Sequence, residues 1–127
     1  MKIILNTSFV TLNDYIDAER SNKYKAAQLK KSQTNKVAFL AGTKGTIKGN
    51  PINKDKNHDV KITWFKPNNR QDHDNISFAK KFILDGLQKA EIIKGDSPRY
   101  IRNFIDIFEV DKTRDYISCI VEFIEVD

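Results

Sequence analysis

The stretch VKITWFK at residues 60–66 alternates apolar with polar side chains, and this two-residue period predicts a half-buried β-strand. Pro67 and the asparagines after it end the strand, and residues 70–75 lead into a helix. Apolar side chains then recur three and four positions apart, which predicts an amphipathic helix with Asp74 or Asn75 as its N-cap. The apolar positions of this helix are Ile76, Ala79, Ile83, Leu87 and Ala90.

On the N-terminal side, residues 2–10 are rich in β-branched and aliphatic side chains and predict another strand. Thr11 is a suitable N-cap, and Asp14 follows three residues later as a short capping-box acid. These residues predict a helix over 12–41. Residues 32–35 are poor helix formers, so a break in the helix is expected there.

A long basic loop and two strands complete the chain. Residues 42–59 contain three glycines and are nearly all polar, which predicts a loop. Residues 95–98 form a turn, and the segments 100–110 and 116–126 are rich in strand-forming residues. Because only residues 111–115 separate these two segments, their spacing predicts a β-hairpin.

The order strand, helix, strand, helix and hairpin predicts one α+β domain over residues 1–127, with a mixed sheet of about four strands and two main helices. A length of 127 residues suits a single hydrophobic core.

The lone Cys119 excludes an internal disulfide and a cysteine-based zinc site. No apolar run is long enough for a membrane span or a signal-peptide core, so we expect a soluble, cytoplasmic protein with no membrane partner.

Charge is distributed unevenly along the chain. Residues 1–70 carry 14 Lys and Arg against 5 Asp and Glu, whereas residues 71–127 carry 8 against 12, for a net charge of +5. A basic half followed by an acidic half indicates a surface for a polyanion beside a carboxylate cluster. Lysines that only solvate a small domain would give the same totals, so charge leaves both interpretations open.

Asp72 and Asp74 lie two residues apart where the predicted strand passes into the helix. Side chains at i and i+2 can converge in an extended or turn conformation. Neighbouring carboxylates repel each other unless a cation lies between them, and a hard divalent cation such as Mg²⁺ prefers oxygen ligands of this kind. The structural alternative is that Asp74 caps the helix and Asp72 lies in a turn.

Two further residues extend this candidate site. Lys81 follows Asp74 by seven residues, which places it near the same helix face two turns along, within reach of the carboxylates or a bound phosphate. Asp96, in the turn after the helix, provides a third carboxylate of the kind that a metal-dependent phosphodiesterase uses. The structural alternatives are an ion pair between Lys81 and Asp85 and a simple turn at Asp96.

These residues resemble, in their order, the RusA family of Holliday junction resolvases, which are small endonucleases typical of phages and prophages. The resemblance rests on the motif Asp72-His73-Asp74-Asn75, on a helix that carries Lys80-Lys81 and Leu84-Asp85-Gly86-Leu87, and on Asp96 shortly after it. The order of elements is similar over most of the chain, but only residues 70–96 are specific.

One position differs from the family's motif. The family places its catalytic lysine four residues after the second aspartate, where this chain has Phe78. Counting back from Asp85 favours Lys81 over Lys80 for that role.

The resemblance implies a Mg²⁺-dependent DNA endonuclease, with Mn²⁺ as a substitute and no small-molecule cofactor. Its substrate would be a four-way DNA junction, resolved by a homodimer during recombination and repair in the cytoplasm of a bacterial host. It also implies that Asp72, Asp74 and Asp96 hold the cation and that Lys81 acts in catalysis.

We expect contacts to DNA phosphates from basic residues of the first helix, the long loop and the segment around the second helix. These residues are Arg20, Lys23, Lys30, Lys31, Lys44, Lys48, Arg70 and Lys80. The alternative is a non-catalytic basic DNA-binding module of phage origin, whose acidic residues are structural. A metal-dependent ribonuclease with similar carboxylates is a third interpretation.

Overall fold

A computed structural model describes the whole chain, residues 1–127, and contains four helices and five strands. Their bounds are β1 Lys2–Leu5, α1 Leu12–Ser21, α2 Lys23–Ala41, β2 Ile47–Lys48, β3 His58–Lys66, α3 His73–Ser77, α4 Lys80–Lys89, β4 Ile101–Val110 and β5 Ser118–Glu125. No helix in the chain combines the length and the apolar character that crossing a bilayer requires.

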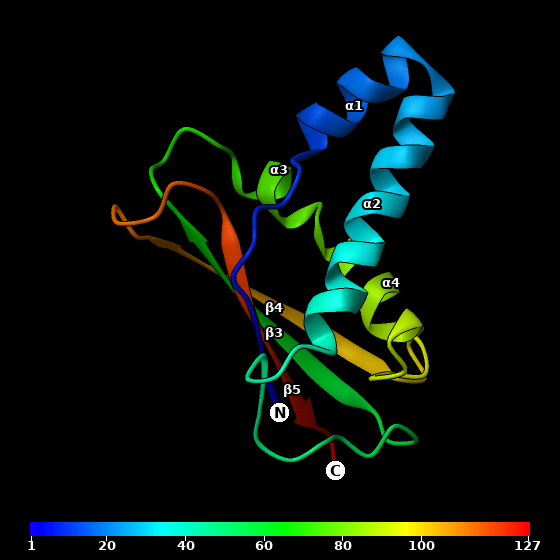
Figure 1. Cartoon of the computed structure of the whole chain (residues 1–127). Coiled ribbons are helices and arrows are strands. Elements are labelled where there is room, and N and C mark those ends of the chain that lie inside the picture. The colour runs from blue at the N-terminus through cyan, green and yellow to red at the C-terminus, as the bar shows by residue number, and fades with distance from the viewer.

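The strands form one mixed sheet in the order β2-β1-β5-β3-β4, which confirms the predicted α+β class. The strand predicted at residues 60–66 is β3, and it pairs antiparallel with β5 and parallel with β4. The parallel pair requires a crossover connection, which α3 and α4 provide. The helices cover one face of the sheet, and the first half of α2 extends beyond it together with α1 (Figure 1).

The core lies between the sheet and the helices. Alternate side chains of β3 point into it, so Val60, Ile62 and Trp64 are fully buried. They belong to one cluster of 19 buried apolar residues that also includes Ile83 and Leu87 of α4. Cys119 is part of the same cluster, and burial raises the pKa of its thiol.

The other face of the sheet has no helix on it. The alternate residues of the strands lie there, and three isoleucines are substantially exposed: Ile4 by 36%, Ile105 by 43% and Ile124 by 41%. We call this surface the open sheet face.

The expected hairpin between the last two strands is wrong. β4 and β5 do not pair with each other but lie on opposite sides of β3. The connecting segment, residues 111–117, crosses the end of β3, where the Asp111 amide donates to the Lys66 carbonyl and Ser118 pairs with Phe65. A short connection fits this crossing as well as a hairpin, so the length of the connection does not distinguish the two arrangements.

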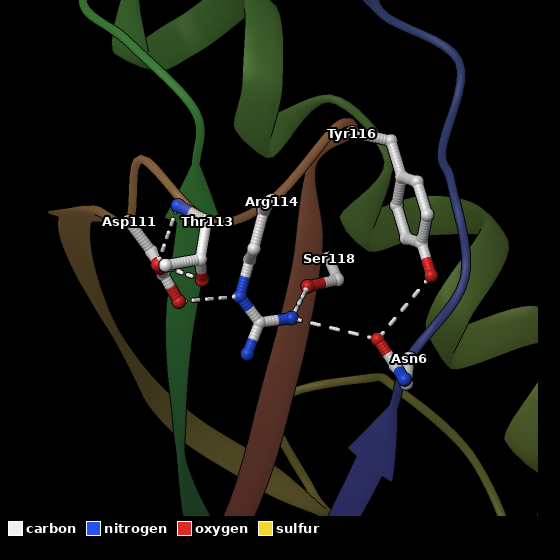
Figure 2. A network of polar contacts seen from close by, with 6 residues as sticks. All are labelled: Asn6, Asp111, Thr113, Arg114, Tyr116 and Ser118. Atoms are coloured by element: carbon white, nitrogen blue, oxygen red, sulfur yellow. Dashed lines mark hydrogen bonds and ion pairs between the residues drawn. The ribbon is translucent and has the colours of Figure 1, made fainter.

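Arg114 holds that crossing segment in place (Figure 2). Its Nε donates to Asp111 Oδ2 at 3.0 Å, and its Nη1 donates to Ser118 Oγ. The guanidinium lies 4.6 Å from the centre of the Phe65 ring, and Nη1 also reaches Asn6 Oδ1. The polar and aromatic contacts together tie the segment to its neighbouring strands.

The N-terminal helical region divides at a different place from the one predicted. The break is at Asn22, whose backbone is extended and whose Oδ1 accepts from the Tyr24 amide at 2.7 Å, whereas α2 continues through residues 32–35. Packing compensates for the weak propensity there, since Gln33 is buried and its Oε1 accepts from the Val10 amide. The Thr11 capping box with Asp14 forms as predicted.

Two other boundaries also differ. The loop expected over residues 42–59 contains the short strand β2, which pairs with β1 through Ile3 and Ile47. The second helix begins earlier than predicted and is divided into α3 and α4 around Phe78.

α2 and α4 approach each other most closely at Gly86. A β-carbon built on Gly86 would lie 2.5 Å from Val37 Cβ and 2.8 Å from the Thr34 carbonyl oxygen. Real β-carbons do not approach other heavy atoms so closely, because packed interiors leave little room for adjustment. Only glycine therefore allows this separation of the two helices.

We expect Gly86→Ala to lower the free energy of unfolding by about 1–3 kcal/mol, the usual cost of overpacking, despite the higher helix propensity of alanine. Gly42→Ala is the matched control, because a β-carbon there meets only ordinary contacts, the nearest at 3.6 Å. Urea denaturation of both variants measures the difference. Equal stability of the Gly86 variant and the wild type would contradict the close approach.

Candidate functional site

Asp72 and Asp74 lie together at the end of the connection between β3 and α3. Asp72 occupies the N-cap position of α3 in an extended conformation but makes no side-chain capping bond. Asp74 lies in the first turn, and its Oδ1 accepts from the Asn75 amide at 3.0 Å. The expected N-cap at Asp74 or Asn75 is therefore wrong by two or three residues, and neither aspartate serves as a side-chain cap of the usual kind.

Both carboxylates line one open hollow of about 430 Å³, and all six of its lining residues are polar or charged. They are Lys66, Asn69, Gln71, Asp72, His73 and Asp74. The two aspartates form no ion pair, so their charge faces the hollow and the solvent. Asp72 and Asp74 thus share one hollow, as expected of residues two positions apart at a turn.

Residues of the hollow and of α3 contact β4 and α1. The His73 ring stacks on the Phe108 ring with centres 3.8 Å apart and planes within 3°. Lys66 Nζ lies 5.9 Å from the same ring. Asn75 is buried; its Oδ1 accepts from the Asn13 amide at 2.9 Å, and its Nδ2 donates to Gln71. Asn75 thus ties α3 to the start of α1, a role that its place in the motif alone does not indicate.

Asp96 is not brought together with this pair. It lies in the loop between α4 and β4, and Lys81 Nζ lies 3.1 Å from its Oδ2. No group of three or more His, Cys, Asp or Glu side chains is placed to hold a metal ion. The expected set of Asp72, Asp74 and Asp96 is therefore not assembled, because Asp96 follows α4 whereas the pair precedes it.

Lys81 is engaged by other carboxylates than this pair. Besides Asp96, its Nζ lies 3.1 Å from Asp85 Oδ1, one turn further along α4. The hydrogen bond with Asp96, and then that with Asp85, raises the pKa of Lys81. The structural alternative, an ion pair between Lys81 and Asp85, therefore forms, and the ammonium lies with Asp85 and Asp96.

Lys80 belongs to a different cluster. Its Nζ lies 2.6 Å from Asp106 Oδ2 on β4, and Asp106 Oδ1 accepts from the buried Trp64 Nε1 at 2.9 Å. The ammonium also lies 4.5 Å from the centre of the Phe104 ring. Lys80, which was expected to contact DNA, is therefore engaged within the chain. No local pattern in the sequence pairs Lys80 with Asp106, which lies 26 residues further along the chain.

The other basic residues expected to contact DNA are exposed. None of them forms an ion pair within the chain, so their charges are available to a polyanion. They are Arg20 on α1, Lys23, Lys30 and Lys31 on α2, Lys44 and Lys48 in and near β2, and Arg70 before α3.

Comparison of the chain with protein-family models, with curated proteins and with solved structures gives no match.

Proposed function

We propose that this protein is a Mg²⁺-dependent DNA endonuclease that cuts branched DNA, with four-way junctions as its main substrate, in recombination and repair. The observation that carries the proposal is the hollow in which Asp72 and Asp74 face solvent without forming an ion pair. We place the activity in the cytoplasm of a bacterial host, encoded by a phage or prophage, as the resemblance to the RusA family implies.

Two carboxylates are a suitable protein contribution to a Mg²⁺ site on DNA. Mg²⁺ is usually held by one or two carboxylates together with water and substrate phosphate oxygens. Asp72 and Asp74 would hold the cation, which lowers the pKa of bound water and stabilises charge on a phosphate. Mn²⁺ prefers similar ligands and would substitute. Asp96 does not fit this set, and Lys81 keeps it paired instead.

A second candidate function is a DNA-binding module without catalysis. The absence of a three-carboxylate group favours it, as does the engagement of Lys81 by Asp85 and Asp96. Chelation separates the two functions, since EDTA should abolish phosphodiester cleavage by the enzyme and leave DNA binding unchanged.

We expect Asp74→Asn to abolish cleavage while the fold survives. Asparagine keeps an oxygen that can accept from the Asn75 amide, and one negative charge beside Asp72 is removed. Stability without metal should therefore equal or slightly exceed that of the wild type, and junction binding should hold or tighten. Loss of even an outer-shell residue costs about 10–100-fold at metal sites, so cleavage should fall at least about a hundredfold.

The matched control is Glu125→Gln, which removes one exposed negative charge outside the hollow. Cleavage of a labelled junction, its binding without metal, and the melting temperature are measured on both variants. Full cleavage by Asp74→Asn would show that the active site lies elsewhere.

We expect the protein to act as a homodimer. Resolving a four-way junction requires paired nicks, and a two-fold dimer presents two identical sites in the symmetry of the junction. On the open sheet face, Ile4, Ile105 and Ile124 are exposed apolar side chains that a second copy would cover.

Sedimentation velocity at micromolar concentration should therefore give the mass of a dimer, and Ile105→Glu should shift it towards a monomer. A wild-type monomer that resolves junctions at full rate would refute the dimer.

We expect the exposed lysines of α2 to contribute to affinity for all forms of DNA. Replacing Lys30 and Lys31 together by glutamine should weaken binding to duplex and junction alike. It should also make the salt dependence shallower by about 0.9 log units for each phosphate that is no longer neutralised. The control replaces Arg99 and Lys112, which are exposed in the loop before β4 and in the 111–117 segment. A salt slope that does not change would mean that Lys30 and Lys31 only solvate the helix.

A further inference from the structure

α1 and the first half of α2 form an arm that contributes little to the core apart from Tyr15, whose ring packs against Phe78 and Phe82. α1 has no buried residue, and before Gln33 the only buried residue of α2 is Ala26. The remaining buried residues of α2, Gln33, Val37 and Ala41, lie in its second half, next to the domain. We call residues 12–31 the arm, which extends away from the sheet (Figure 1).

Tyr24 stands near the tip of this arm with 76% of its surface exposed. An aromatic ring so exposed adds almost nothing to packing. It lines a hollow of about 390 Å³ on one face of α2 with Lys23, Ala27, Gln28 and Lys31. From Lys23 to Lys31 this stripe spans two turns of the helix, about 12 Å at 1.5 Å per residue.

The chemistry of this stripe is that of a nucleotide site. Lys23 and Lys31 provide an ammonium at each end, and neither forms an ion pair. Between them, the ring of Tyr24 and the methyl group of Ala27 present an apolar surface, and the Gln28 amide offers both a donor and an acceptor. Aromatic faces stack on bases and lysines bind phosphates in proteins that hold single strands.

We propose that this stripe binds an unpaired or unstacked nucleotide, with the base stacked on Tyr24 and the flanking phosphates at Lys23 and Lys31. The inference rests on the proposed function, because it assumes that DNA is the ligand. In a continuous duplex both faces of each base are covered by stacking. The site is therefore specific for a single strand, a strand end or the branch point of a junction.

Charge complementarity supports a nucleic acid as the occupant. α2 contains five lysines and no acidic residue in 19 positions. Four of the lysines are exposed, and only Lys36 is engaged, since its Nζ donates to the Ser8 carbonyl and burial lowers its pKa. An apolar protein partner would have to cover these charges without an acid from α2 to balance them.

The test uses the full-length protein and one labelled strand in three forms: single-stranded, as a duplex, and within a four-way junction. Tyr24→Ala should weaken binding to the single strand and the junction roughly five- to one-hundredfold, the effect of removing one base–aromatic stack. Binding to the duplex and the salt slope should not change, because no charge is removed. Tyr24→Phe should retain wild-type affinity.

The matched control is Phe39→Ala. Phe39 is 77% exposed on the same helix, but its nearest lysine in the helix, Lys36, is already engaged. This variant should bind all three forms like the wild type. Circular dichroism checks that the arm stays helical, as alanine favours.

The outcomes distinguish this inference from the proposed function. Unchanged affinity of Tyr24→Ala for the single strand and the junction, in a protein that cleaves junctions, would overturn the site and leave the nuclease intact. Equal weakening for the duplex, or an equal effect of Phe39→Ala, would also overturn it. Selective weakening in a protein that cleaves nothing would support the site and refute the nuclease.

Discussion

At Gly86 the backbone of α4 lies so close to α2 that a β-carbon would stand 2.5 Å from Val37 Cβ. This contact fixes the second half of α2 on α4, whose inner side chains Ile83 and Leu87 belong to the core. Because α2 continues as a single helix of 19 residues, the direction of its exposed half follows from that one packed region. The position of Tyr24 relative to the sheet therefore depends on a glycine in a helix that lies far along the sequence.

Two connections of the chain lie next to each other at the end of β3. The chain leaves β3 after the buried Lys66 and turns into α3, and the 111–117 segment crosses the same end on its way from β4 to β5. Ligands of open α/β sheets bind outside the carboxyl ends of parallel strands, where the connections diverge. The hollow of Asp72 and Asp74 lies at this end of the parallel pair β3 and β4. Asn75 ties the start of α3, beside this hollow, to the start of α1.

Features that depend on residues close together in the sequence were predicted. The differences between prediction and structure come from contacts between residues far apart in the sequence. β3, the Thr11 capping box and the shared hollow of Asp72 and Asp74 each depend on residues within a few positions of one another. Lys80 with Asp106 is separated by 26 residues, and Lys81 with Asp96 by 15, so nothing in the sequence distinguished these partners from solvent or phosphate. The strand order failed for the same reason, since β4 forms its pairs with β3 and not with its neighbour in the chain.

The acidic residues of the second half of the chain and the lysines of the arm differ in how many ion pairs they form. In the acidic half, five of the twelve acidic residues lie within an ion pair: Asp85, Asp96, Asp106, Asp111 and Glu122. The lysines at the tip of the arm form no ion pair. They attract phosphates over distances longer than a direct contact, and this attraction is strongest at low salt, where screening is weak. At the hollow, Asp72 and Asp74 would repel a phosphate that came close without a cation between them. In the proposed function, binding by the arm is therefore independent of metal, whereas contact between DNA and the hollow requires it.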